Sequence, residues 1–341
     1  MDQALNFAIV GCGVIAPAHA RSISELPGVQ LVAVCDVIEE RAHRLAQNFP
    51  AQVYTDYREM LERDDIHIVD VLTPSGLHAE VGSAAARCGK HVIVEKPIDV
   101  SRDEAEALIR ACRKAGVKLC SISQHRFDPA TVELKKAVEA GRLGELHFGG
   151  AYTQWYRAQD YYDSAEWRGT WALDGGALMN QSIHYVDLLQ YIMGPVEEVF
   201  AYSARRAHTR MEAEDIAVAS LRFKNGALGV VEGMTLAYPG FCTRLEVFGA
   251  EGGVVIENDQ IKEWRLRSAE NPSAQQEQHP LIVGSSSADI WYQGHRRQIQ
   301  DMIEAIREDR QPLVNGAEGL KPLEIVLAIY ESAKTGMPVK L

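Results

Sequence analysis

The stretch FAIVGCGVIAPAHA near the start of the chain constrains the fold more than any other part of the sequence. Gly11, Gly13 and Ala16 follow the spacing G-x-G-x-x-[GA], directly between an apolar strand-like run and a helical run. In this spacing the first glycine makes a tight turn, the second lets the backbone approach a pyrophosphate, and the small third residue lets the helix pack on the strand. The pattern predicts a dinucleotide-binding βαβ unit, with the phosphates at the helix amino terminus, where unpaired N–H groups favour anions.

The second apolar run, LVAVCD, ends on Asp36, 23 residues after Gly13. An acid at this offset is expected to bind the ribose hydroxyls of the dinucleotide. Its charge would repel a 2′-phosphate, so the sequence favours NAD over NADP. Arg41 and Arg44 on the following helix keep NADP open as the second choice. A tight turn followed by an incidental surface aspartate is the alternative interpretation.

Two patterns of apolar runs divide the chain near residue 124. Before it, LNFAIV, VQLVAVCD, IHIVDVLT, HVIVEK and KLCSIS alternate with helical stretches, which predicts an α/β fold with a doubly wound parallel sheet. After it, strand-like pieces follow one another, with hairpin turns expected at 224–226 and 249–253. We predict a dinucleotide-binding domain over 1–124 and an α+β domain over 125–341, built on a large, mostly antiparallel open sheet. The C-terminal helices can pack back on the first domain, and the polar stretch 269–290 is a predicted loop.

The composition argues against several classes of protein. A net charge of −12, without a basic stripe, argues against a nucleic-acid partner. The amino terminus lacks a basic, apolar leader, and no run approaches the roughly 20 apolar residues of a membrane span. We therefore expect a cytoplasmic protein with no membrane partner. The six cysteines lack C-x-x-C spacing and mostly stand in apolar stretches, which favours buried, reduced thiols over disulfides or zinc.

The run KHVIVEKPIDV ends the fourth predicted strand with Glu95, Lys96 and Pro97. In a doubly wound sheet ligands bind beyond the carboxyl ends of the strands. An ammonium held there loses hydration, which lowers its pKa toward the range useful for proton transfer. Glu95 can orient the amine or cap backbone groups, and the bond between Lys96 and Pro97 is a candidate cis peptide. A solvated lysine at a strand edge is equally compatible with this position.

Other strand ends supply further candidates for the cofactor site. Thr73 and Pro74 turn the chain and are expected to pack beside the cofactor. His78, one turn into the next helix, is expected on the helix surface or as a cap rather than in catalysis. The predicted cofactor contacts are Gly11, Gly13, Val14, Ile15, Asp36, Thr73, Pro74, His78, Glu95, Lys96 and Gln124.

A polar stripe crosses the helical segment DGGALMNQSIHYVDLLQYIMG. Asn180, His184, Asp187 and Tyr191 are spaced by 4, 3 and 4 residues and so share one helix face. His184 is suited to exchanging a proton near neutral pH, and Asn180 can hold its ring or a substrate hydroxyl. The alternative is a core histidine satisfied by Asp187. Two ligands without a partner cluster make a metal at H-x-x-D unlikely.

With VGCGVIA, VCD, TPSGLHAE, GKHVIVEKP and GGALMNQSIHYVDLL in this order, the chain resembles the Gfo/Idh/MocA oxidoreductases over essentially its whole length. The resemblance implies a Rossmann domain, an open-sheet domain and a tightly bound nicotinamide cofactor used on sugars, inositols or related polyols. It also implies that Lys96 and His184 flank the reacting carbon. In the inositol dehydrogenase branch an aspartate stands at the position of Asn180, which cannot ionise, so Lys96 and His184 are left to divide the proton chemistry.

The resemblance also suggests a sugar pocket in which tryptophan rings face pyranose C–H groups and Arg168 reaches a hydroxyl, a carboxylate or a cofactor phosphate. The tryptophans in question are Trp155, Trp167 and Trp171. The other expected substrate contacts are Lys96, Arg126, Arg168, Asn180 and His184, with Tyr238, Gln154 and Tyr156 as weaker candidates.

The expected activity is NAD-dependent oxidation of a secondary hydroxyl of a sugar, glycoside or cyclitol, or reduction of the matching ketone. Lys96 and His184 are expected to act as acid and base, with Asn180 beside them. One alternative is a glycosidase or lyase that recycles NAD through transient oxidation and elimination. Another is a non-catalytic NAD-binding sensor. A homo-oligomer, dimer or tetramer, is expected through the outer face of the second sheet.

Overall fold

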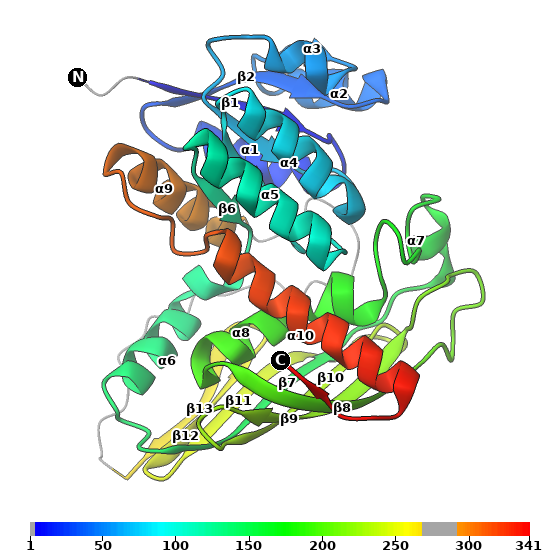
Figure 1. Ribbon diagram of the computed structural model, residues 1–341, viewed down its shortest axis with the longest axis vertical. Coiled ribbons are helices and arrows are strands. Elements are labelled where there is room, and N and C mark those ends of the chain that lie inside the picture. The colour runs from blue at the N-terminus through cyan, green and yellow to red at the C-terminus, as the bar shows by residue number, and fades with distance from the viewer. Residues whose placement is uncertain (1–3, 268–291) are drawn as a thin grey trace. The chain divides into compact units, whose positions relative to one another are not determined.

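The computed structural model describes residues 4–267 and 292–341 (Figure 1). The predicted loop at 269–290 lies outside them. The described residues form two compact units. Of the described residues, the first unit contains those up to Gln124 and residues 292–320. The second unit contains residues 125–267 and Lys321–Leu341.

The first unit is built on a six-stranded sheet in the order β3-β2-β1-β4-β5-β6. Every pairing in this sheet is parallel. Its strands are β1 (Leu5–Val10), β2 (Val29–Cys35), β3 (Gln52–Tyr54), β4 (Ile68–Val71), β5 (His91–Val94) and β6 (Leu119–Ser121). Its helices are α1 (Ala16–Ser24), α2 (Glu39–Ala46), α3 (Tyr57–Leu61), α4 (His78–Arg87), α5 (Arg102–Ala115) and α9 (Gln293–Arg307). The predicted doubly wound α/β class is confirmed.

Helix α5 shows how local sequence sets these elements. The hydroxyl of Ser101 accepts a hydrogen bond from the Glu104 backbone N–H, which caps one of the unpaired donors of the first turn. The helix ends at Gly116, whose φ of 69° is a left-handed conformation that glycine adopts without strain. Between these signals Ala105, Leu108 and Cys112 recur on one face and are buried.

Helix α9 belongs to the first unit although it lies far along the chain. Its residues Ile299, Met302 and Ile303 join the buried cluster that includes Ile9 and Ile93 of the sheet. Gln298 of α9 also accepts a hydrogen bond from the Ser123 N–H and donates one to the Ser121 carbonyl, both at 2.8 Å. The end of β6 is therefore completed by a side chain from α9.

The second unit is built on an eight-stranded sheet in the order β13-β12-β11-β7-β10-β9-β8-β14. Its pairings are antiparallel except for β7 with β10, which confirms the mostly antiparallel prediction. The strands are β7 (Leu146–Gln154), β8 (Val196–Ala204), β9 (Ile216–Phe223), β10 (Leu228–Met234), β11 (Thr243–Gly249), β12 (Gly252–Glu257), β13 (Gln260–Leu266) and β14 (Val339–Lys340).

Helices α6 (Pro129–Glu139) and α8 (Ile183–Met193) lie on one face of this sheet (Figure 1). Gly149 of β7 lets α8 approach closely, because a Cβ there would lie 2.7 Å from Cγ of Met193. The strands show the alternating burial of a sheet covered on one face, as in β9. The other described helical elements are the short 3₁₀ helices η1 (Ser75–Leu77) and η2 (Gln124–Phe127), α7 (Gln159–Asp163), the π-helix η3 (Ala177–Ser182) and α10 (Gly316–Thr335). The residues of α10 up to Leu320 belong to the first unit and the rest to the second.

The cysteines and the helices bear on two further predictions. All six cysteines are free thiols, as predicted; Cys88 is exposed and Cys242 is half-buried. Among the residues that the structure describes, no helix combines the length and the apolar character needed to cross a membrane.

Candidate active site

The glycine loop joins β1 to α1. Gly11 has a φ of 97°, and a Cβ there would lie 2.5 Å from the Leu72 carbonyl oxygen, so the position requires glycine. A Cβ on Gly13 would meet nothing within 4 Å, which leaves open space beside the backbone. Helix α1 begins after Ile15, whose side chain makes no capping hydrogen bond. The loop therefore offers an anion the N–H groups of an uncapped helix start, as a pyrophosphate requires.

Asp36 lies directly after β2 and holds the glycine loop in place. Its Oδ2 accepts a hydrogen bond from the Cys12 N–H and its Oδ1 one from the Ile38 N–H, both at 2.8 Å. Each carboxylate oxygen retains acceptor capacity for a ribose hydroxyl. Val37, which follows Asp36, is 88 % exposed and offers an apolar surface beside the acid. The residues present fit the dinucleotide that the sequence predicts.

The other predicted cofactor residues lie at the carboxyl ends of the same sheet. Val14 is exposed and Ile15 half-buried between β1 and α1, and Thr73 and Pro74 are half-buried after β4. Gln124 is half-buried and follows β6. These positions agree with the rule for ligand binding in open parallel sheets.

Glu95, Lys96 and Pro97 form a corner at the end of β5. The peptide bond between Lys96 and Pro97 is cis, as predicted. Strand β5 pairs with β4 and β6, so Lys96 does not lie on an edge strand. Lys96 is half-buried, and its backbone N–H donates to Oε2 of Glu95 at 2.9 Å. Glu95 therefore caps a backbone group, which is one of the two roles considered for it.

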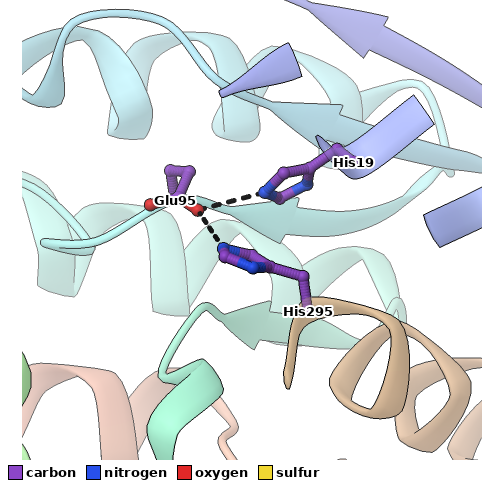
Figure 2. A group of neighbouring side chains, drawn as sticks. All are labelled: His19, Glu95 and His295. Carbon is purple, nitrogen blue, oxygen red and sulfur yellow. Dashed lines mark hydrogen bonds and ion pairs between the residues drawn. The ribbon is translucent and has the colours of Figure 1, made fainter. Parts of the chain in front are cut away.

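A buried network that sequence reasoning missed lies behind this corner (Figure 2). His19 of α1 contacts Asp70 of β4 at 2.7 Å and Oε1 of Glu95 at 3.1 Å. His295 of α9 lies 3.4 Å from the same Glu95 oxygen. Although burial raises the pKa of Glu95, the two histidines hold it well below its ordinary value. His19 stands inside the glycine-loop stretch of the sequence, but nothing local indicates its partners.

The prediction for His78 is wrong. The side chain is buried, not on the helix surface, and cannot contact a cofactor. Its Nδ1 lies 2.7 Å from the Pro97 carbonyl oxygen and its Nε2 2.9 Å from the Thr73 carbonyl oxygen. Burial lowers the pKa of His78. The histidine joins the loops after β4 and β5, so its role is to hold two strand ends together.

In the second unit, the π-helix η3 carries Asn180 and leads directly into α8. Its first N–H groups are capped from outside, because Ala177 donates to the Glu214 carbonyl at 2.9 Å and Leu178 to Oε1 of Glu214 at 2.8 Å. Burial raises the pKa of Glu214 to about 7. A Cβ on Gly176 would collide with this side chain. Single π-helical turns of this kind are frequent at functional sites.

Asn180 has a carboxylate beside it that sequence reasoning missed. Its Nδ2 donates a hydrogen bond to Oδ1 of Asp174, and Oδ2 of Asp174 accepts one from the Gly169 N–H at 2.7 Å. Asp174 is buried. Residue 180 cannot ionise, yet an acidic group adjoins its amide.

Two residues of the polar stripe on α8 contact different side chains: Asp187 contacts Arg126, and His184 contacts His125. Asp187 forms a bidentate pair with Arg126, at 2.8 Å from Nε and 2.6 Å from Nη2. Both side chains are buried, and Arg126 also lies over the Tyr191 ring. The prediction that Arg126 contacts substrate is therefore wrong, because its guanidinium is enclosed in a structural pair.

His184 is half-buried and packs edge-on against His125, with ring centroids 5.0 Å apart. His125 contacts Asp128 at 2.8 Å and Asp259 at 3.1 Å. Although burial lowers it, these carboxylates hold the pKa of His125 well above its ordinary value. A cationic ring thus lies beside His184, and no sequence signal indicated it.

Three of the predicted sugar-pocket residues, Trp155, Trp167 and Arg168, lie in one cluster with Tyr161. The Arg168 guanidinium lies 4.2 Å from the Tyr161 ring and 4.6 Å from the Trp167 ring, and Arg157, which was not predicted, lies 5.0 Å from the Trp155 ring and 5.3 Å from that of Tyr161. We call these five residues the arginine–aromatic cluster.

Two contacts surround this cluster. Gln181 of η3 donates to the Tyr161 hydroxyl at 3.0 Å, which links the cluster to the helix carrying Asn180. Tyr238 is 74 % exposed and packs against Tyr156. Within the described residues, no carboxylate forms an ion pair with Arg157 or Arg168.

Comparison with known proteins adds independent information. Residues 5–123 match an oxidoreductase family's NAD-binding Rossmann fold, and residues 135–341 match the C-terminal alpha/beta domain of the same family. The first match confirms the predicted cofactor, NAD.

Individual relatives match over nearly the whole chain. The crystal structure of the WlbA dehydrogenase from Bordetella pertussis, in complex with NADH and UDP-GlcNAcA, is 34 % identical and has a TM-score of 0.91, covering 100 % of this chain and 99 % of that one. The myo-inositol 2-dehydrogenase of Thermotoga maritima is 28 % identical over 99 % of this chain and 98 % of its own. The scyllo-inositol 2-dehydrogenase (NAD(+)) of Bacillus subtilis is 28 % identical over 100 % and 97 %.

Proposed function

Because this chain belongs to the Gfo/Idh/MocA oxidoreductase family, we propose that it is an NAD-dependent dehydrogenase of a secondary hydroxyl on an anionic sugar. The observation that carries the substrate class is the arginine–aromatic cluster. Sugars linked to a nucleoside diphosphate, and uronic acids in particular, have the required chemistry. The reverse reaction, reduction of the matching ketone, uses the same groups.

The anionic substrate follows from the charges of the cluster. Arg157 and Arg168 are half-buried and rest on aromatic rings, and among the described residues neither has a carboxylate partner within ion-pair distance. Guanidinium groups kept unneutralised in such surroundings suit bidentate binding of a carboxylate or phosphate. The WlbA dehydrogenase, 34 % identical, was crystallised with a nucleotide-linked sugar acid, which supports the same class. A neutral cyclitol would leave both charges unused.

The proposed chemistry divides proton transfer between Lys96 and His184. When bound, NAD supplies the hydride acceptor. Gly11, Gly13 and Asp36 would hold it through the loop and carboxylate described above. Lys96 takes the proton of the reacting hydroxyl, since it is half-buried at the carboxyl end of the parallel sheet, where ligands bind.

His184 is proposed as the second proton-transfer group. The ring of His125, which contacts two carboxylates, packs edge-on against it with ring centroids 5.0 Å apart. Asn180 can donate to or accept from a substrate hydroxyl while Asp174 orients its amide. With these roles, proton transfer does not require an ionised side chain at position 180.

A substrate panel tests the proposal. We expect NADH to form, read by its absorbance, with a nucleotide-linked uronic acid such as UDP-GlcNAcA, and far less with myo-inositol or scyllo-inositol. NADP should support slower turnover than NAD, because Asp36 disfavours a 2′-phosphate. Arg157→Ala and Arg168→Ala should each raise the substrate KM about 10- to 100-fold, the loss of one charge-assisted contact of about 1.5–3 kcal/mol.

Arg113→Ala, on the exposed side of α5, is the matched control and should leave the substrate KM unchanged. Faster oxidation of the inositols than of any anionic sugar would contradict the substrate class. Release of an aglycone without net NADH would instead identify the enzyme as a glycosidase or lyase that recycles its cofactor.

We also propose that the chain forms a homo-oligomer through the face of the eight-stranded sheet opposite α8, which the described residues leave exposed. Tyr202 is 71 % exposed and pairs across strands with Val218, itself 43 % exposed. Leu228 and Phe248 are exposed on either side of Phe148 in another row. Exposed apolar rows on adjacent strands are typical of a surface that a second protein covers.

Light scattering tests this assembly. Wild type should have the mass of a dimer or tetramer, and the double variant Tyr202→Glu, Val218→Glu should move to monomer, because two charges on one row oppose burial. Lys114→Glu, on an exposed residue of α5, should not change the mass. A monomeric wild type at micromolar concentration would exclude the proposed interface.

A further inference from the structure

Four buried ionisable side chains converge behind the corner of Glu95, Lys96 and Pro97. They come from four separate elements: His19 from α1, Asp70 from β4, Glu95 after β5 and His295 from α9. Figure 2 shows both histidine rings directed at the Glu95 carboxylate. Burying several ionisable groups is costly unless each is paired, so the arrangement needs a reason.

The contacts of His19 define its protonation. Its Nδ1 lies 2.7 Å from Oδ2 of Asp70 and its Nε2 lies 3.1 Å from Oε1 of Glu95. An ionised carboxylate only accepts hydrogen bonds, so both ring nitrogens must carry protons. Although burial alone lowers it, the two carboxylates raise the pKa of His19 to about 10. His19 is therefore a buried imidazolium at neutral pH.

The Glu95 carboxylate connects this cation to the corner. Its Oε1 contacts both histidines, and its Oε2 accepts the hydrogen bond from the Lys96 backbone N–H at 2.9 Å. We propose that His19, supported by Asp70 and His295, is a positioning residue that fixes Glu95 and through it the backbone that presents Lys96. This inference rests on the base role proposed for Lys96.

The same atoms also suit a metal ion, because His19, Glu95 and His295 bring three ligand atoms within 4.8 Å of one another. A ring that holds protons on both nitrogens has no lone pair for a metal. The short contact to Asp70 and the high pKa of His19 favour the protonated ring. We therefore interpret these contacts as hydrogen bonds of a protonated His19 and not as a metal site.

Stability as a function of pH tests the imidazolium. The groups facing His19 are Asp70, Glu95 and, on α9, His295. Its folded pKa of about 10 exceeds the ordinary value of 6.5, so its contribution is complete below about pH 6.5 and is lost as the pH rises toward 10. The denaturation midpoint of wild type should exceed that of His19→Gln most at low pH, and the gap should narrow toward pH 10. A gap independent of pH would overturn the assignment.

Kinetics test the positioning role. His19→Gln should lower kcat about 10- to 100-fold, as expected when a reacting group is displaced by a fraction of an ångström to an ångström. The KM for NAD should stay within about twofold of wild type, because the glycine loop and Asp36 are unchanged. Asp70→Asn should lower kcat by itself and have little further effect in the His19→Gln background, since it acts through His19. His43→Gln, exposed on α2, is the matched control.

A purely structural role would lower the melting temperature without changing kcat per active site, and would contradict the inference. So would additive effects of the two substitutions on kcat, or stoichiometric zinc in the purified enzyme by elemental analysis. Lys96→Ala separates this inference from the proposed function. If Lys96→Ala turns over normally, the proposed function fails; if it is inactive while His19→Gln keeps full kcat, only the positioning role fails.

Discussion

Replacing Lys96 by alanine is expected to lower kcat about 10²- to 10⁴-fold, the contribution of a positioned base. The proposed base is removed, while the glycine loop and Asp36, which hold the cofactor, are unchanged. The backbone conformation of the corner should not change, because the contact with Glu95 uses the backbone N–H of residue 96. NAD affinity should therefore stay near that of wild type, measured by the fluorescence of bound NADH or by calorimetry.

Two companion variants make this test specific. Lys96→Arg keeps the positive charge but cannot deprotonate in the working pH range, so it should be nearly as inactive as Lys96→Ala. Lys114→Ala, on an exposed lysine of α5, should have normal kcat. Turnover within about threefold of wild type for Lys96→Ala, with intact NAD binding, would show that another group takes the proton.

The fold and the cofactor site could be predicted because their signals are local. Gly11 needs a positive φ and has no room for a Cβ, and Asp36 stands at a fixed offset because β2 lies beside β1 in this fold. Lys96 was proposed for the same reason, since the end of a parallel strand is where ligands bind. Such features depend on neighbours along the chain or on one strand pairing.

The network behind the corner could not be predicted, because its members are brought together only by the tertiary fold. His19 and His295 are separated by most of the chain, and α9 follows strands β7 to β13 of the second unit. His78 also shows that sequence spacing does not reveal the tertiary surroundings of a side chain. Its place one turn into a helix suggested a surface, yet the helix turns it toward two carbonyl oxygens. Sequence spacing gives the face of a helix but not what that face meets.

In the second unit, the sequence also could not predict the partner of Asp187. Stripe geometry correctly placed His184 and Asp187 on one helix but left open which residue the acid binds. The structure brings Arg126, from the segment just after β6, onto Asp187. Arg157 and Arg168, neither of which has a carboxylate partner among the described residues, lie in loops where no periodic pattern applies.

Arg126→Ala should destabilise the protein by about 3–5 kcal/mol, because it leaves the buried Asp187 carboxylate without its bidentate partner. Guanidinium chloride denaturation, followed by fluorescence and circular dichroism, measures the loss. If Arg126 contacted substrate instead, the variant would keep its stability and show a raised substrate KM. The two roles therefore predict opposite changes in two separate measurements.

A double substitution completes the test. Arg126→Met together with Asp187→Leu removes both charges and fills the space with apolar atoms, and replacing a buried pair in this way is often neutral. We expect the double variant to recover most of the stability that either single variant loses, a coupling that distant sites do not show. Because α8 carries His184 in the same helix, the recovered variant should also regain kcat. Recovered stability without recovered turnover would mean that the charges of the pair, and not only its packing, contribute to the orientation of His184.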